Sequence, residues 1–193
     1  MTKPRPHAFV PLLNAQLSAA QVAVLVACGA LFLAASSYIA VPMVPVPVTM
    51  QTYAVMLVGA LSGWRLGATI VLVWLAAGLA GLPVLAGGTG GIAPFTGPTA
   101  GYLASFPFAA AFCGWMAERG WTRRVGPSFL GFLLAQAICL VPGALWLATF
   151  VGPAKALAFG VTPFLVGAVI KAALAVASVV VISRFAGPSA SAP

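Results

Sequence analysis

The chain has 193 residues, 62% of them hydrophobic, and carries only nine basic side chains and one acidic side chain. This composition excludes a soluble globular domain, which needs far more polar surface, and indicates an all-α polytopic membrane protein. The length suits one integral membrane domain, 1–193, with six spans of about 20 residues. The net charge of +8 does not indicate nucleic-acid binding, because the basic residues form no dense patch interleaved with aromatic residues.

Six apolar segments are expected to form transmembrane helices, and Pro, Gly and Arg lie in the gaps between them. The segments are 20–41, 50–62, 66–81, 101–117, 129–151 and 162–185. The second to fourth are shorter than a usual span, so we expect them to be tilted partners with soft boundaries. The remaining ends, 1–18 and 186–193, are expected to be flexible tails.

The basic residues predict the orientation of these spans. With six spans and a cytoplasmic N-terminus, the inner side holds Lys3, Arg5, Arg65, Arg119, Arg123, Arg124 and Arg184. The outer side holds only Lys155. Because short cytoplasmic loops carry an excess of Lys and Arg, this distribution predicts that both termini are cytoplasmic.

The two expected outer loops are uncharged and unusual in composition. The first, 41–49, alternates Pro and Val, and proline restricts the backbone, so it should be extended and stiff. The second, 81–101, contains two glycine-rich strings, 87–91 and 97–101. Irregular backbone at membrane depth is tolerated where it is buried in protein or lines a cavity. We therefore favour loops that close over a pocket open to the outside, with packed connecting loops as the alternative.

The groups that enzymes use are scarce. The chain has no phosphate-binding loop motif, its one histidine is His7, and its one carboxylate side chain is Glu118. General acid–base or metal catalysis would lack its usual residues, so we expect no catalytic residue, metal or cofactor. Cys28, Cys113 and Cys139 lie far apart within apolar runs and are expected to be small buried hydrophobic residues. The chain is expected to bind and pass a molecule rather than transform it.

Lys171 is the leading candidate for ligand binding. It lies about 12–15 Å along the last span, too deep for its ammonium to reach water easily. A charge at that depth is costly unless it faces a cavity, a partner or a ligand, so a substrate carboxylate is a candidate counterion. The alternative is a lysine that is uncharged or bonded to backbone carbonyls.

Further polar and aromatic candidates flank the two outer loops. Thr49 and Gln51 supply donors and acceptors for an uncharged polar group, or else cap and brace the second span. Tyr102 could stack on a ligand ring or hydrogen-bond to it, or else belong to an interfacial belt. The tryptophans expected to face lipid or the interface are Trp74, Trp115, Trp121 and Trp146.

Several strings in the chain resemble the BioY family, the biotin-specific substrate-binding (S) components of energy-coupling factor (ECF) transporters. They are 38–42 (YIAVP), 46–53 (VPVTMQTY), 65–68 (RLGA), 81–84 (GLPV), 87–91 (GGTGG), 97–102 (GPTAGY) and the Pro-Phe pair at 163–164 leading to Lys171. The Pro-Val-Thr-x-Gln-Thr and Gly-Gly-x-Gly-Gly strings are specific in this order and spacing.

The resemblance implies a six-helix protein of the bacterial plasma (inner) membrane that captures biotin from outside. It would work with a transmembrane coupling protein and with ATPase subunits that hydrolyse ATP, all of them separate chains. Besides Lys171, Gln51, Thr49 and Tyr102, it implies that Gly88, Gly90 and Gly91 contact the substrate. Ala30 and Ala34 on the first span would contact the coupling protein, because small residues four apart allow close helix approach. From the spacing alone, that neighbouring helix could equally belong to this chain.

One departure from the family pattern affects the site. The family usually reads Pro-Gly-Asp-Leu-x-Lys here, whereas this chain has Ala168 in place of the aspartate and Val166 in place of the proline. An aspartate three residues before Lys171 would share its helix face. Biotin remains the leading substrate; the alternatives are another carboxylated vitamin, or a solitary carrier that works without ATPase partners.

Overall fold

A computed structural model of the chain describes residues 17–185. The expected tails lie outside the described residues, apart from Leu17 and Ser18. Ser18 does not belong to a tail, because it caps the first helix. Its hydroxyl accepts a hydrogen bond from the Gln21 amide at 3.3 Å, and the Gln21 side chain accepts one from the Ser18 amide at 2.9 Å. This reciprocal pair fixes where the helix begins.

The described chain is built from helices, with one small β-ladder. The long helices are α1 (Ala19–Tyr38), α2 (Gln51–Leu79), α4 (Ala100–Glu118), α5 (Val125–Val151) and α7 (Thr162–Phe185). The short elements are β1 (Ala40–Val41), β2 (Val48–Thr49), η1 (Ala86–Gly88), α3 (Ala93–Thr96), η2 (Trp121–Arg123) and α6 (Pro153–Gly160). Within residues 17–185, five helical stretches are long and apolar enough to cross a membrane, which confirms the all-α polytopic fold.

The second and third expected spans are both contained in α2. Gly63 has φ 79° and ψ 171°, a conformation that interrupts the helix and that glycine adopts readily. A Cβ on Gly67 would lie only 2.8 Å from the Gly59 Cα. In a straight helix these two residues would be about 12 Å apart, so the chain reverses at Gly63. Segments 51–62 and 64–79 are therefore two antiparallel limbs joined by one residue rather than by a loop.

Glu118, the single carboxylate side chain, braces this reversal. Its Oε1 accepts a hydrogen bond from the backbone amide of Trp64 at 3.0 Å. That amide begins the second limb of α2 and has no partner within its own helix. The carboxylate is therefore held at the helix turn, away from Lys171.

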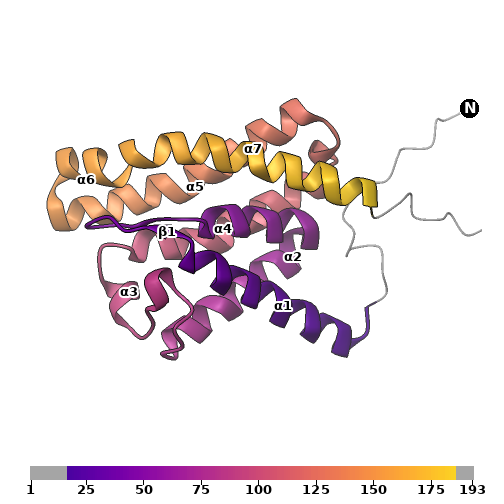
Figure 1. The fold of residues 1–193 in the computed structure, drawn as a ribbon, viewed down its shortest axis with the longest axis horizontal. Coiled ribbons are helices and arrows are strands. Elements are labelled where there is room, and N and C mark those ends of the chain that lie inside the picture. Colours follow the sequence, from indigo (N-terminus) through magenta and orange to yellow (C-terminus); the bar gives the residue numbers. More distant parts are fainter. Residues whose placement is uncertain (1–16, 186–193) are drawn as a thin grey trace, which may run out of the picture.

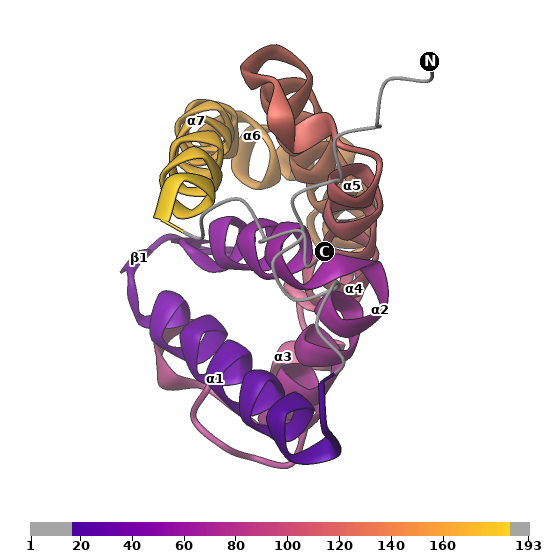
Figure 2. The same ribbon diagram turned by 90° about the vertical axis from the view of Figure 1, so that its right-hand side faces the viewer.

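The helices are arranged in layers (Figures 1 and 2). α1 packs on α2, α2 on α4, α4 on α5, and α5 on α6 and α7. The two views place α1 and α7 on opposite sides of the layer that α2 and α4 form. In Figure 1 the first turn of α1 and the last turn of α7 lie at the same end of the molecule, as an even number of crossings requires.

The two uncharged loops are more regular than expected. β1 and β2 pair antiparallel, with Ala40 opposite Thr49 and Val41 opposite Val48, so the Pro-Val segment closes a short hairpin. The second loop contains η1, α3 and an isolated bridge between Leu85 and Thr89. The connection before α7, which carried no predicted structure, forms α6.

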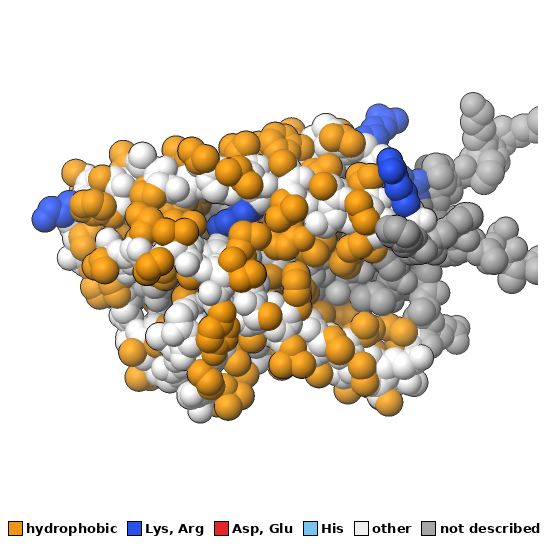
Figure 3. All heavy atoms as spheres, in the orientation of Figure 1, with side chains coloured by type: hydrophobic (Ala, Val, Ile, Leu, Met, Phe, Trp, Pro, Cys, Tyr) orange, Lys and Arg blue, Asp and Glu red, His pale blue; other side chains and the backbone are white. Residues whose placement is uncertain are grey.

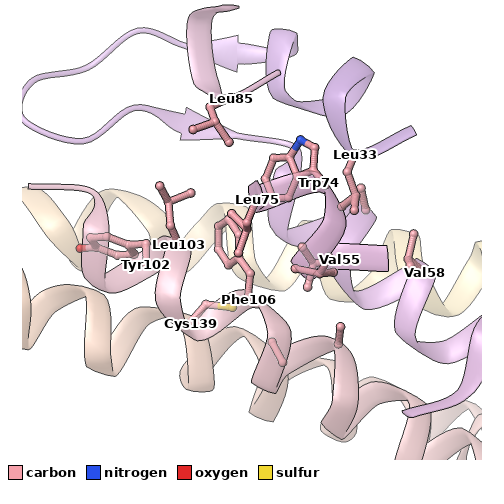
Figure 4. Close-up of a cluster of buried hydrophobic side chains, with 14 of the residues drawn as sticks. Leu33, Val55, Val58, Trp74, Leu75, Leu85, Tyr102, Leu103, Phe106 and Cys139 are labelled. Atoms are coloured by element: carbon pink, nitrogen blue, oxygen red, sulfur yellow. The ribbon is translucent and has the colours of Figure 1, made fainter. Parts of the chain in front are cut away.

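The buried core changes two sequence predictions. Trp74 is fully buried, donates its indole N–H to the Val84 carbonyl at 2.9 Å and stacks on Phe106 with 6.1 Å between ring centroids. Figure 4 shows it at the centre of the apolar cluster, so the prediction that it faces lipid is wrong. Cys113 and Cys139 are buried as expected, but Cys28 is exposed on α1.

The outer surface agrees with a membrane setting. Trp115 and Trp146 are partly exposed, as predicted for residues facing lipid or the interface. Figure 3 shows hydrophobic side chains spread over the whole face, with basic side chains at its two ends and at one point between them. Such a surface would favour aggregation in water but is compatible with the hydrocarbon core of a membrane.

Candidate ligand-binding site

A cavity of about 270 Å³ lies between α2, α4, α5 and α7. The β1–β2 hairpin and the loop after α2 contribute to its wall, as predicted for loops that close over a pocket. Its lining residues are Val46, Pro47, Thr49, Gln51, Thr52, Leu85, Ala86, Thr89, Pro94, Thr99, Tyr102, Leu103, Phe106, Gln136, Cys139, Leu140, Phe164 and Lys171. Most of this wall is apolar, with a few convergent polar groups, which is the usual character of a small-molecule site.

Lys171 lies in the wall of this cavity and is only 7% exposed. Its ammonium donates a hydrogen bond to the Thr52 hydroxyl at 3.2 Å. Thr52 is in the first turn of α2, so this bond joins the start of that helix to the middle of α7. A hydroxyl is neutral and cannot balance the lysine charge, and Glu118 is bound elsewhere. The geometry leaves a buried cation beside an empty space that an anion could fill.

Thr49 and Gln51 form a small network at the junction of β2 and α2. The Thr49 hydroxyl donates to Gln51 Oε1 at 3.0 Å and accepts from the Gln51 backbone amide at 3.3 Å. Gln51 Nε2 is buried and has no hydrogen-bond partner. The two interpretations of these residues are therefore compatible: Thr49 braces the helix start, and by holding the amide oxygen it leaves the amide donor free.

Gln136 is a polar residue of the cavity that the sequence interpretation missed. It lies in α5, is buried, and its Nε2 also lacks a partner. A buried amide donor without a partner costs about 1–3 kcal/mol, which a ligand acceptor would recover. The signal was present in the sequence, because Gln136 is the single amide within the apolar run 129–151.

Tyr102 contributes its ring rather than its hydroxyl. It is buried, which excludes the interfacial-belt alternative. Its hydroxyl donates to the Gly160 carbonyl at 2.8 Å, and its ring stacks on Phe164 with 6.0 Å between centroids. Since the hydroxyl proton is already used within the protein, Tyr102 offers the cavity an aromatic surface.

The three glycines expected to contact the substrate lie elsewhere. Gly88, Gly90 and Gly91 are not in the cavity wall, whereas their neighbours Ala86 and Thr89 are. Gly88 and Gly91 have φ of 73° and 81°, and a Cβ on Gly90 would lie 2.3 Å from the Leu82 carbonyl oxygen. These glycines shape the loop that places Ala86 and Thr89 in the wall, and their direct contact with the substrate stays a prediction.

The small residues of α1 lie partly against the chain's own core. Ala30 and Ala34 are half-buried and pack against the chain's own core cluster. Each therefore contacts this chain and keeps an exposed part, and contact with the coupling protein stays a prediction. Ala168 is buried as well but does not line the cavity.

The arrangement binds rather than catalyses. The cavity presents one cation and two free amide donors around apolar and aromatic walls, which suits a ligand with an anionic group, a carbonyl-type acceptor and an apolar body. Among residues 17–185, no cluster of His, Cys, Asp and Glu could hold a metal ion. Fold and site together define a multi-pass membrane protein with a cavity suited to a small acceptor-rich molecule.

Comparison with known proteins identifies the family. The family model described as the BioY family matches residues 10–187, and the chain belongs to this family. A "Probable biotin transporter BioY" from Pyrococcus horikoshii is 43% identical over 150 residues, which cover 76% of this chain and 88% of that protein. "Biotin transporter BioY2" from Lactococcus lactis subsp. cremoris is 38% identical over 152 residues, covering 78% and 83%.

A solved structure supports the same assignment. The crystal structure at 2.1 Å of the S-component for biotin from an ECF-type ABC transporter superposes with a TM-score of 0.72 at 27% identity. The match covers 87% of this chain and 95% of that one. The chain is thus a multi-pass plasma membrane protein with the fold of a transporter S component, and it is not an enzyme.

Proposed function

We propose that this chain captures biotin and hands it to an ATP-driven coupling module. The observation that carries the proposal is Lys171, whose ammonium is buried at a cavity and bonded only to a neutral hydroxyl among the described residues. Biotin carries one carboxylate, one ureido group and an apolar bicyclic body. These match the one cation, the free amide donors and the apolar wall.

We assign the carboxylate and the ureido group of biotin to different polar residues of the cavity. The carboxylate pairs with Lys171 and Thr52, which already share a hydrogen bond at 3.2 Å. The ureido carbonyl accepts from the unpartnered amides of Gln51 and Gln136. The ring of Tyr102 and the side chain of Leu85 cover the apolar body. A charge pair shielded from water in this way is worth more than one at a surface.

The topology and the partners form the second part of the proposal. Both termini are cytoplasmic, since the inner side then holds most of the basic residues, and the β1–β2 hairpin faces outward. The chain has no phosphate-binding motif of its own. The energy therefore comes from ATPase subunits, linked through a transmembrane coupling protein.

Equilibrium binding of radiolabelled biotin to the purified protein tests the proposal. We expect saturation near one biotin per chain, with weak competition by lipoate, pantothenate and nicotinate. Biotin uptake by cells that express the chain with and without a coupling module tests the partners. Absence of saturable biotin binding would overturn the proposed substrate.

Ala168 favours one second candidate, an S component for a different carboxylated vitamin. It stands where the family pattern has an aspartate, so the ligand loses a polar partner near Lys171. If this candidate is right, another carboxylated vitamin will displace bound radiolabelled biotin at a lower concentration than unlabelled biotin does. A solitary carrier instead requires uptake in cells that lack every coupling subunit.

A further inference from the structure

A second hollow lies on the outer surface, between the second limb of α2 and α4. This groove has a volume of about 670 Å³ and is lined almost entirely by apolar groups. A neighbouring hollow of about 550 Å³ shares four of its residues and extends it toward α5. The shared residues are Gly101, Ala104, Phe108 and Trp146. The groove shares only Leu103 with the proposed biotin cavity, and neither hollow includes Lys171 or either free amide.

The length of the groove matches one leaflet of a bilayer. Along α2 it extends from Trp64 to Leu75, and along α4 from Ala111 to Ala100. Eleven residues at 1.5 Å each span about 16 Å. Half of a hydrocarbon core of about 30 Å is about 15 Å. A single acyl chain lying along the groove would therefore reach from the membrane surface to the bilayer centre.

A positive charge marks the surface end of the groove. The Arg65 guanidinium lies over the Trp64 ring, 4.9 Å from its centroid, and Trp64 lines the groove. Glu118, at the same end, accepts from the Trp64 amide. Arg65 is exposed and belongs to the 65–68 string by which the sequence resembles its family, yet it lies outside the biotin cavity.

We propose that this groove is a binding site for an anionic phospholipid, with its phosphate at Arg65 and one acyl chain along α2 and α4. Charge complementarity favours such a lipid over a neutral one, because Arg65 offers a donor fork that matches a phosphate. A transmembrane helix of a partner would need a contact surface across the whole bilayer. The groove is only as long as one leaflet, which favours a single acyl chain. The site is independent of the proposed biotin function.

Native mass spectrometry of the purified chain with phosphatidylglycerol tests the headgroup contact. Arg65→Gln should lower phosphatidylglycerol binding about five-fold, the effect of one basic residue near anionic lipid. Arg184→Gln removes an arginine from the end of α7, which does not line the groove, and should have little effect. Phosphatidylcholine, whose phosphate is balanced by its own choline cation, should bind more weakly than phosphatidylglycerol to the native chain and should respond less to Arg65→Gln.

A groove-filling substitution tests the acyl-chain contact. Ala104 is exposed and lines both hollows, so Ala104→Phe should displace both lipids. Ala177→Phe makes the same change at an exposed position of α7 and should leave lipid binding intact. Both variants should melt at the temperature of the native chain, which shows that they are folded.

Three results would overturn the lipid site. The first is equal phosphatidylglycerol binding by the native chain, Arg65→Gln and Ala104→Phe. The second is an equal loss in Ala104→Phe and Ala177→Phe. The third is normal lipid binding by Ala104→Phe together with lost assembly with a coupling protein, which would assign the groove to a partner helix. None of these results depends on whether the native chain binds biotin.

Discussion

The two sides of α4 show opposite ways of packing a helix. Toward α2, glycines bring the backbones into contact: a Cβ on Gly59 would lie 2.3 Å from the Ala110 carbonyl oxygen, and one on Gly114 would lie 2.2 Å from the Trp64 amide nitrogen. Toward α5 and α7, the ring of Tyr102 lies between Gly143 of α5 and Phe164 of α7 and forms part of the cavity wall. Close backbone contact makes one side rigid, and that rigidity supports a hollow on the other.

The largest expected effect is on the close-packed side. Gly114→Ala would force a methyl group against backbone atoms of Trp64 and Gly63, which cannot move aside as a side chain would. We expect the free energy of unfolding to fall by about 3 kcal/mol. Thermal unfolding in detergent measures this change.

Gly126→Ala is the matched control for that prediction. Gly126 is also helical, but a Cβ there would have no atom within 4 Å. Its replacement should leave stability unchanged or raise it by up to about 1 kcal/mol, because alanine favours helix. Equal melting temperatures for the two variants would show that the glycine contact does not hold α2 and α4 together.

The next largest effect concerns the charge in the cavity. Lys171→Met keeps most of the side-chain volume and removes the ammonium, so biotin affinity should fall by about 2 kcal/mol or more. The melting temperature of the ligand-free protein should not fall, because a buried charge without an acidic partner is costly. Lys155→Met, at an exposed position of α6, should bind biotin normally. A parallel loss of affinity and stability in Lys171→Met would instead indicate a structural lysine.

Gln136→Leu should have a smaller effect on binding. The substitution removes one amide donor facing the ligand, so affinity should fall by about 1 kcal/mol. The ligand-free protein should be as stable as before or more stable, because Gln136 Nε2 has no partner to lose. Gln51→Leu should lower both the biotin affinity and the stability, because Thr49 would lose its acceptor. Titration calorimetry and thermal unfolding of both variants would show whether they differ in this way.

Tyr102→Phe should have the smallest effect on binding. The ring stays in the cavity wall, and the lost hydroxyl donates to Gly160 rather than to the ligand space. We expect little change in biotin affinity and a loss of about 1 kcal/mol in stability. A large loss of affinity with unchanged stability would show that the hydroxyl contacts biotin.

The sequence predicted the parts of this molecule that depend on the cost of burying polar groups. Lys171 stands out as a charge within an apolar run, and Thr49 and Gln51 stand out as polar residues beside a proline-rich loop. Gln136 carried the same signal and was missed because no neighbouring motif drew attention to it.

Other features depend on which way a helix faces, and composition does not fix that in a membrane. Trp74 resembles the lipid-facing tryptophans in sequence, yet its indole N–H finds the Val84 carbonyl within the core. The positive φ angles of Gly87, Gly88 and Gly91 shape the loop, a role that composition alone did not predict. The gap between the predicted spans 50–62 and 66–81 coincides with Gly63, but the reversal takes one residue instead of a loop.

The pairing between Lys171 and the ligand carboxylate is tested most directly by changing both partners. Biotin and biotinamide, which lacks the charge, are titrated against the native chain and Lys171→Met. The native chain should prefer biotin by about 30-fold or more, which corresponds to about 2 kcal/mol, and the variant should lose that preference. An equal preference for biotin in both proteins would contradict the central claim that this buried ammonium binds the carboxylate.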